Sequence, residues 1–378
     1  MLAANLTQEG RTTLSVPTEE LKMLPAFFNP RGKLVRDVSI VCYDVYSKLN
    51  PKPNLSFADA LAGTGARGIR VANEVPSIER VILNDINSKA LEYAKESAKL
   101  NNVEEKCIFS RSEVCSFLLT RKESEGERFD YVDLDPFGSP SDHIDCAMRS
   151  VREGGMLSFS ATDSAVLCGV YPKVSLRKYL GLPLRSEYCH EVGMRLLFGL
   201  AAQSAMRFES GIEPLFCHHN MHYFRAYLTI RVGNAHSREN EKEIGFILHC
   251  FLCGHRSIVS REAFFSPKER IDMSCPECKK EKVAIAGPLW TGKIQSNDFV
   301  SACHERSDLG IFSPELDIPL YYDLNTIKVK NGLPRINVVV EEMKARGYAA
   351  SRTRLNPNSL RTDATKKEIQ KVVLELGH

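Results

Sequence analysis

The feature that most constrains the fold is an alternation of short apolar runs with longer amphipathic runs from Leu55 to Ser160. The short runs predict buried strands and the longer ones predict helices, because side chains repeat every two residues in a strand and every 3.6 in a helix. Strands alternating with helices at this spacing predict a parallel sheet covered on both faces. We expect strands at 57–61, 81–83, 107–109, 131–134 and 156–160, and helices opening at 68, at 88–100 with Ser88 as N-cap, at 113–119 and at 142–151.

The segments around this alternation predict the domain organisation. Residues 1–50 form a predicted N-terminal extension that contributes to the active site, with a strand-like run at 11–16 and a helix-like run at 35–45. Residues 51–233 form a predicted Rossmann-like α/β domain, which a long helix at 187–208 and a strand or hairpin at 216–232 complete. The composition turns polar at 233–235, so we expect residues 234–378 to form a smaller α+β domain.

A glycine-rich turn follows the first strand of the alternation. Gly63, Gly65 and Gly68 match the pattern G-x-G-x-x-G and stand where a helix opens. Glycines at such a turn let the backbone approach a ligand beside the positive N-terminus of the helix. Asp85, at the end of the next strand, is placed to accept hydrogen bonds from the ribose hydroxyls of NAD or of S-adenosylmethionine. The turn alone leaves open a dehydrogenase, a methyltransferase and a tight turn that binds nothing.

The fourth strand of the alternation ends in Asp135-Pro136-Phe137, which resembles the Asp/Asn-Pro-Pro-Tyr/Phe signature of amino-methyltransferases. The amine of a purine is a poor nucleophile, because its lone pair is delocalised into the ring. A carboxylate at Asp135 and the rigidly held carbonyl of Pro136 can both accept from that amine, which localises the lone pair and aims it at a sulfonium methyl. The Asp135 carboxylate can also take the proton, and Phe137 can stack on the base.

Four of the twelve cysteines form two Cys-x-x-Cys pairs. Cys250 and Cys253 are followed after 21 residues by Cys275 and Cys278, which is close to the spacing of a zinc ribbon at 246–283. A site closed by four thiolates predicts a structural metal rather than a catalytic one. We expect the eight single cysteines to be small buried apolar residues of a protein in a reducing compartment. His218, His219 and His222 lack the spacing of a helical metal site, and ordinary surface and core roles are favoured for them.

Charge is distributed unevenly along the chain. The formal net charge is +3, yet from Lys328 to the end the sequence holds eleven Lys or Arg and five Asp or Glu, a local excess of six. A basic C-terminal region on a near-neutral body predicts a localised surface for phosphate contacts. The candidate contacts are Lys330, Arg352, Arg354 and Arg361. The longest apolar runs are too short for a membrane span, and the N-terminus lacks a signal pattern. We therefore expect a cytoplasmic protein.

Several motifs together resemble the tRNA guanine-N2 dimethyltransferases, in their archaeal-like form. The resemblance spans nearly the whole chain and implies conversion of the guanine at tRNA position 26 to N2,N2-dimethylguanine. It also implies S-adenosylmethionine as co-substrate, tRNA as partner, and no obligate protein partner. The motifs that carry the resemblance are 27–31 with Arg36-Asp37, 65–70, 134–140, 161–163, 176–179, 189–193 and 315–320.

The resemblance also implies roles for individual residues. Asp135 would be catalytic, with Phe27 and Phe137 stacking on a flipped-out guanine. Of the cofactor residues, Arg36 or Arg67 would meet the methionine carboxylate, Asp85 the ribose, and Glu113 with Val114 the adenine. Two departures from the family pattern are Ala62-Gly63 in the cofactor turn and Ser112-Glu113, of which the second weakens the adenine assignment.

Two alternatives to guanine methylation stay open from the residues. The Asp-Pro-Phe motif is shared with nucleic-acid adenine-N6 methyltransferases. A non-catalytic zinc-ribbon RNA-binding protein would account for the cysteines and for the basic C-terminal region without any turnover.

Overall fold

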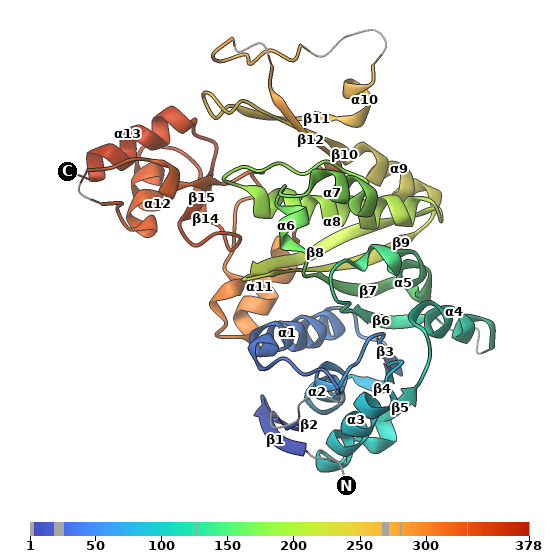
Figure 1. The fold of residues 1–378 in the computed structure, drawn as a ribbon. Helices are drawn as coiled ribbons and strands as arrows, with labels where there is room; N and C mark the ends of the chain where they lie inside the picture. Colours follow the sequence, from blue (N-terminus) through green and yellow to red (C-terminus); the bar gives the residue numbers. More distant parts are fainter. Residues whose placement is uncertain are drawn as a thin grey trace. The chain divides into compact units, whose positions relative to one another are not determined.

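The computed structural model describes residues 4–18, 26–124, 128–266, 272–279, 282–330 and 332–377 (Figure 1). The chain divides into two compact units. The first comprises Met1–Ser160, Tyr227–Val232 and Ser301–Phe312, and the second comprises Ala161–Ala226, Gly233–Val300 and Ser313–His378. In the described part of the chain, no helix combines the length and the apolar character that crossing a bilayer requires.

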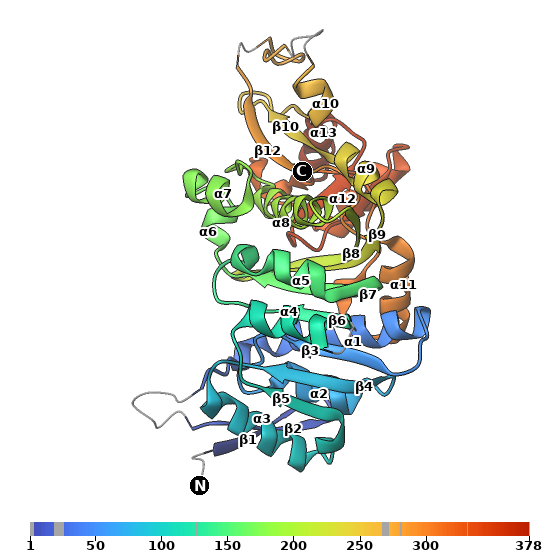
Figure 2. The same ribbon diagram turned by 90° about the vertical axis from the view of Figure 1, so that its right-hand side faces the viewer.

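The first unit is built on five parallel strands in the order β5-β4-β3-β6-β7, which Figure 2 shows side by side. The register aligns Ala58 in the central strand with Ile82 on one side and Val132 on the other. All three side chains are fully buried, as expected for the short apolar runs that these strands contain. The strands are β3 Leu55–Asp59, β4 Ile78–Asn84, β5 Cys107–Ser110, β6 Phe129–Leu134 and β7 Val151–Ala161.

Helices connect these strands as the alternation predicts. Helix α1 contacts α2, α2 contacts α3, and α4 contacts α5. An N-terminal hairpin of β1 and β2 precedes them, and β2 packs on α2 and α3. The bounds are β1 Ala4–Glu9, β2 Thr12–Pro17, α1 Lys33–Leu49, α2 Ala66–Glu74, α3 Ser88–Leu100, α4 Val114–Ser124 and α5 Ile144–Ser150.

The bounds of α3 match the prediction, but the predicted N-cap is wrong. Asn87, not Ser88, is the capping residue, and its side-chain oxygen accepts a hydrogen bond from the backbone N–H of Lys89 at 3.0 Å. Asn87 has the extended backbone that a cap requires, whereas Ser88 already lies in the first helical turn.

Strands β8 Ser210–Asn220 and β9 Tyr223–Val232 complete a seven-stranded sheet in the order β7-β9-β8. Only two residues join them, so they form the hairpin that was one of the two predicted alternatives for 216–232. The long predicted helix is α8, Cys189–Met206, which packs on β8 and β12 within the second unit and is buried along most of its length.

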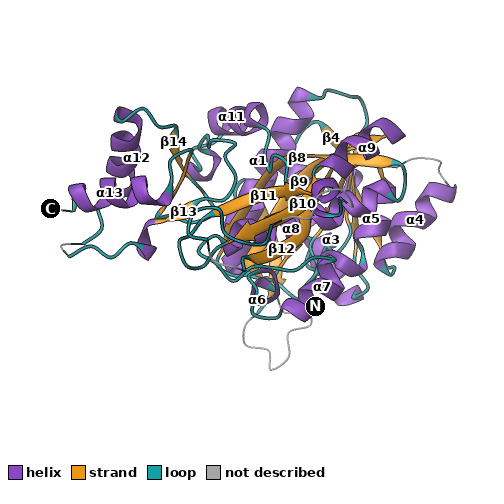
Figure 3. Cartoon of the chain, turned by 90° about the horizontal axis from the view of Figure 1, so that it is seen from above, coloured by secondary structure: helices purple, strands orange, loops and turns teal. Residues whose placement is uncertain are grey.

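The second unit contains two further three-stranded sheets, ordered β11-β10-β12 and β13-β15-β14. The latter packs with α12 and α13 around a core that includes Val339, Met343, Leu360 and Ile369 (Figure 3). The remaining bounds are α6 Ser164–Leu167, α7 Pro172–Tyr179, α9 Asn234–Lys242, β10 Ile244–His249, β11 Arg256–Ser260, α10 Arg261–Phe264, β12 Ala284–Trp290, α11 Asn297–Arg306, β13 Tyr322–Asp323, α12 Ile336–Ala345, β14 Ala350–Arg352, β15 Ser359–Thr362 and α13 Lys366–Leu376.

A buried network of ion pairs lies inside the second unit. Glu191 on α8 is paired with Arg195 at 2.8 Å and with Arg361 on β15 at 2.8 Å. Arg361 also pairs with Glu315 at 2.8 Å, and Arg354 pairs with Glu315 at 3.1 Å. The prediction that Arg354 and Arg361 contact phosphates is therefore wrong, because both guanidinium groups are buried against carboxylates. Lys330 and Arg352 are exposed and stay candidates.

Candidate active site and metal centre

The glycine-rich turn lies at the carboxyl end of β3, where α2 begins. Gly65 has a left-handed backbone, with φ of 77°, and a Cβ atom there would stand 2.6 Å from the Cβ of Ala94. Only glycine meets both conditions without strain. The Asp85 carboxylate follows β4 and accepts hydrogen bonds from the N–H of Gly63 and of Asn87, each at 2.8 Å. The structure thus brings the predicted ribose ligand, Asp85, against the glycine turn.

The predicted adenine ligands lie at the start of α4, after β5. The Glu113 carboxylate accepts hydrogen bonds from the N–H of Cys115 at 2.9 Å and of Ser116 at 2.8 Å. These two hydrogen bonds lower the pKa of Glu113, so the carboxylate is ionised and fixed at the helix N-terminus. Val114 is buried beside it.

Arg67 on α2 contacts two carboxylates at the end of β6. Its Nε lies 2.9 Å from the carboxylate of Asp133, and its Nη2 donates to the carboxylate of Asp135. A third guanidinium nitrogen donates to the hydroxyl of Ser39 at 2.6 Å. The Asp133 carboxylate is fully buried and also accepts from Tyr43, whereas the Asp135 side chain is 36% exposed. Asp135 is therefore the member of the cluster that a substrate can reach.

Asp59, at the end of β3, is a member of this cluster that the sequence analysis did not single out. Its buried carboxylate accepts from the N–H of Gly68 at 3.0 Å. Burial and the nearby charge of Asp133 raise the pKa of Asp59 to about 8, against the opposing charge of Arg67. Burial and the neighbouring carboxylate thus favour the protonated form of Asp59. An acidic residue inside a predicted buried strand was the signal that could have identified it.

Arg36 on α1 lies in a different pairing. Its guanidinium makes two hydrogen bonds to the Glu9 carboxylate, at 2.6 and 2.7 Å, and one to the backbone carbonyl of Asn29 at 2.9 Å. Of the two arginines proposed for the methionine carboxylate, Arg67 is the one that contacts Asp135 directly in the described structure.

Two aromatic rings stand beside the strand end. Phe137 is 77% exposed and Phe27 is 56% exposed, yet their ring centroids are 4.8 Å apart in an edge-to-face arrangement. Pro136 between Asp135 and Phe137 is buried, which holds the backbone of the motif in place. The structure therefore brings Phe27, from outside the alternation, to Phe137 as the resemblance implies. Exposed aromatic pairs of this kind favour ligands with a flat π face.

Two of the single cysteines do not behave as isolated apolar residues. Cys115 on α4 and Cys146 on α5 form a disulfide, so the expectation for these two is wrong. The packing of α4 on α5 brings together side chains that are 31 positions apart in sequence. Cys115 of this disulfide follows Glu113 by two positions in the sequence.

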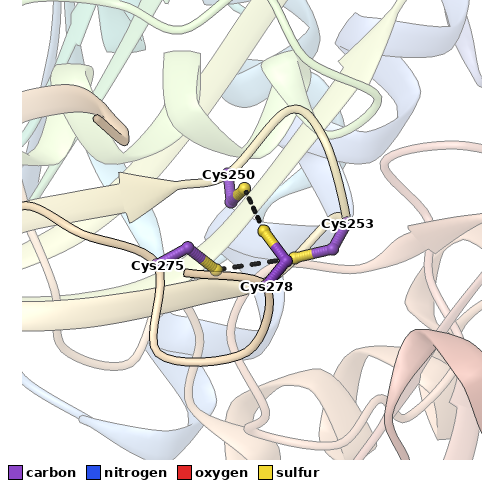
Figure 4. Close-up of side chains that lie close together, drawn as sticks. All are labelled: Cys250, Cys253, Cys275 and Cys278. Atoms are coloured by element: carbon purple, nitrogen blue, oxygen red, sulfur yellow. Dashed lines mark hydrogen bonds between the residues drawn. The ribbon is translucent and has the colours of Figure 1, made fainter. Parts of the chain in front are cut away.

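The four cysteines of the two Cys-x-x-Cys pairs converge, and Figure 4 shows their sulfur atoms directed toward one another. The Sγ atoms of Cys250 and Cys278 are 3.5 Å apart, as are those of Cys253 and Cys275. Gly254 donates its N–H to the carbonyl of Cys250 and Lys279 donates to that of Cys275, so each pair forms a tight turn. A hydrogen bond from the backbone N–H of Cys253 lowers the pKa of the Cys250 thiol to about 7. Four thiols at this separation fit a tetrahedral Zn²⁺ site.

The three histidines considered as a second metal site do not form one among the described residues, where no group of three or more candidate ligands includes His218, His219 or His222. The His218 side chain is fully buried, and the His219 ring stacks on His190 with centroids 3.9 Å apart. Burial lowers the pKa of His219 to about 3, so this imidazole is neutral.

Comparison with known proteins extends over almost the entire chain. Residues 10–374 match the family model described as N2,N2-dimethylguanosine tRNA methyltransferase. The tRNA (guanine(26)-N(2))-dimethyltransferase of Methanothermobacter thermautotrophicus is 36% identical over 386 residues, covering 97% of this chain and 98% of that protein. The protein of the same name from Pyrococcus abyssi is 34% identical, over 94% and 95% of the two chains.

A solved structure is similar over the same extent. The structure of Trm1 from Pyrococcus horikoshii with S-adenosyl-L-methionine has a TM-score of 0.82 and 31% sequence identity, over 98% of this chain and 100% of that one. The fold, the glycine turn and the Asp-Pro-Phe strand end agree with this relationship. The chain therefore belongs to the family of N2,N2-dimethylguanosine tRNA methyltransferases.

Proposed function

We propose that this enzyme transfers methyl groups to the exocyclic N2 of guanine 26 in tRNA and forms N2,N2-dimethylguanine, as its relatives' names state for them. The observation that carries the proposal is the position of Asp135. Its carboxylate is the accessible member of a buried charge cluster, it terminates a strand next to the one that carries the glycine turn, and two exposed aromatic rings adjoin it.

S-Adenosylmethionine, when bound, supplies an electrophilic methyl group on a sulfonium. Of the residues that would hold it, Asp85 would bind the ribose, and Glu113 with Val114 would bind the adenine. Glu113 is already fixed by two backbone N–H groups, and Asp85 likewise, so neither carboxylate has to reorganise to bind. Arg67 or Arg36 would meet the methionine carboxylate. Each is held by protein carboxylates in the described structure, so that carboxylate would have to share its arginine or replace a present partner.

The charge cluster favours a cation in the site. The cluster places three carboxyl groups, those of Asp59, Asp133 and Asp135, around the single guanidinium of Arg67. A negative charge in a partly buried site attracts a sulfonium more strongly than the same charge in water does. The contact with Arg67 also holds the Asp135 carboxylate at the strand end, where it can accept hydrogen bonds from an amine.

Asp135 and the carbonyl of Pro136 would accept the two hydrogens of the guanine N2 amine. This localises the nitrogen lone pair and directs it, and the Asp135 carboxylate then takes the proton that each methyl transfer releases. Phe27 and Phe137 would hold the base by stacking. Because the N2 amine of a stacked guanine in a tRNA helix is out of reach, the base must be flipped out of the stack.

The second part of the chain would bind tRNA and hold zinc. We propose that residues 234–378 act as the tRNA-binding domain after an extension at 1–50 and a catalytic domain at 51–233, with exposed Lys330 and Arg352 as phosphate contacts. Cys250, Cys253, Cys275 and Cys278 would bind a structural Zn²⁺. The proposal includes the cytoplasm as the place where the enzyme meets its tRNA substrate.

The test is methylation of an unmodified tRNA transcript, followed by nuclease digestion and mass spectrometry of the nucleosides. We expect N2-methylguanosine and then N2,N2-dimethylguanosine from the wild-type transcript, and neither from a transcript with adenine at position 26. Formation of N6-methyladenosine, or no product with S-adenosylmethionine, would refute the proposal.

The role of Asp135 is tested in the same assay. Asp135→Asn removes the proton acceptor and should reduce turnover by roughly 100-fold or more, while tRNA binding is retained. Asp142→Asn changes an exposed carboxylate seven positions away and serves as the matched control. Wild-type turnover in Asp135→Asn would remove Asp135 from the mechanism.

A further inference from the structure

A second cluster of metal-ligating side chains lies in the second unit, separate from the four-cysteine site. Cys168 is the C-cap residue of α6, and Cys189 and His190 are the first two residues of α8. One ligand atom from each of the three lies within 4.8 Å of the other two. Both cysteines are free thiols, and all three side chains are half-buried. The cluster is therefore accessible to a small ion.

An unpartnered nitrogen of His190 indicates a missing ligand. Its Nδ1 atom is buried and has no hydrogen-bond partner among the described residues. Leaving a buried polar atom unsatisfied costs about 1–3 kcal/mol, so such atoms usually have a partner. The ring is also held in place, because it stacks on His219 with an interplanar angle of 18°. A metal ion would satisfy the nitrogen without requiring the ring to turn away from His219.

We propose that Cys168, Cys189 and His190 bind a second divalent metal ion, for which Zn²⁺ is the best match. Two thiolates and one imidazole are a ligand set that Zn²⁺ prefers over the harder cations, and three protein ligands leave the fourth tetrahedral position to water. The ion replaces the two thiol protons, which are released to solvent as the metal–sulfur bonds form. Cys189 stands at the N-terminus of an 18-residue helix, beside the Cys168 thiol.

The geometry requires only a small contraction. Zinc–sulfur bonds of about 2.3 Å place two tetrahedral sulfur ligands about 3.8 Å apart. The three ligand atoms already lie within 4.8 Å of one another, so the cluster has to close by at most about 1 Å. Half-buried cysteine side chains can move this far by rotation about χ1. Since α6 packs on α8, the bound ion would fix the residues after β7 to the start of α8.

The experiment counts zinc per chain in the full-length protein. The protein is purified under reducing conditions, reloaded with Zn²⁺, freed of excess metal and analysed by elemental mass spectrometry. We expect Cys189→Ser and His190→Ala to contain one zinc fewer than wild type, whatever the four-cysteine site holds. Cys107→Ser removes a half-buried free cysteine in β5 and should leave the count unchanged.

A conservative variant separates ligation from a folding role. His190→Cys supplies a third thiolate at the same place and should retain the zinc that His190→Ala loses. With Co²⁺ in place of Zn²⁺, wild type should show thiolate charge-transfer absorption that Cys168→Ser reduces. Equal zinc content in wild type, Cys189→Ser and His190→Ala would overturn the proposal. So would a disulfide between Cys168 and Cys189 in the reduced and reloaded protein.

Discussion

The buried carboxylate of Glu191 allows a quantitative test of how much its ion pairs stabilise the fold of the second unit. Burial alone would raise its pKa, but the charges of Arg361 and Arg195 and the N–H of Leu320 outweigh burial and lower the pKa to about 2, from 4.5. A shift of that size corresponds to about 3 kcal/mol of folding free energy. Because the folded-state pKa is depressed, this contribution is fully present above pH 4.5 and is lost as the pH falls toward 2.

The perturbation is Glu191→Gln, which keeps the shape of the side chain and removes its charge. Arg361 would still pair with Glu315, whereas Arg195 would lose its carboxylate, so we expect a loss of about 3 kcal/mol at pH 7, at the low end for a broken buried ion pair. The difference between wild type and variant should shrink as the pH is lowered from 4.5 to 2, since protonation then neutralises Glu191 in the wild type.

The assay is guanidinium unfolding monitored by the fluorescence of Trp290, the only tryptophan in the chain. Its backbone carbonyl accepts a hydrogen bond from Arg195 at 3.1 Å, so the probe lies next to the perturbed network. Glu241→Gln, an exposed carboxylate in the same unit, should match wild type. A Glu191→Gln stability within about 1 kcal/mol of wild type at pH 7, or a difference that does not change with pH, would refute the reasoning.

Three further predictions concern the first unit and the four-cysteine site. Asp85→Ala should raise the KM for S-adenosylmethionine by roughly 10- to 100-fold, the cost of a lost charged hydrogen bond, and an unchanged KM would count against the ribose assignment. Cys115→Ala opens the disulfide whose cysteines are 31 positions apart and should cost about 3–4 kcal/mol by chain entropy. Dithiothreitol should lower the unfolding midpoint of wild type but not of this variant, which has no disulfide left to reduce. Equal sensitivity of both proteins to dithiothreitol would contradict a stabilising disulfide. Cys275→Ser should lose one equivalent of zinc and lower Tm, whereas wild-type Tm without any metal would argue against a structural ion.

The parts of the fold that follow from local pattern could be predicted from the sequence. Each of the strands β3 to β7 contains a short apolar run, and the helices between them repeat apolar positions at helical spacing, so the alternation along the chain and the parallel arrangement could be predicted, whereas the order of the strands in the sheet was not predicted. The Asp-Pro-Phe motif and the glycine turn were found because each is contiguous in sequence. The Cys-x-x-Cys pairs were found for the same reason, since a chelating turn is itself a local structure.

What the sequence did not reveal depends on tertiary partners. Arg361 appeared as a phosphate contact because its neighbours are basic, but its partner Glu191 lies 170 positions earlier. The Cys115–Cys146 disulfide depends on how α4 packs on α5. The role of Asp59 depends on the close approach of Asp133 and Arg67, and no periodic pattern records such an approach.

The contact between Phe27 and Phe137 has a consequence for which molecules can enter the site. A molecule that inserts between the two rings would separate the pair and lose about 0.5–1.5 kcal/mol of ring–ring attraction. A nucleobase recovers more than that, because stacking on aromatic side chains is worth about 1–3 kcal/mol per base. A sugar or an aliphatic side chain offers no flat face to compensate. The two phenylalanines would thus favour aromatic molecules over non-aromatic ones before any hydrogen bond to Asp135 is made.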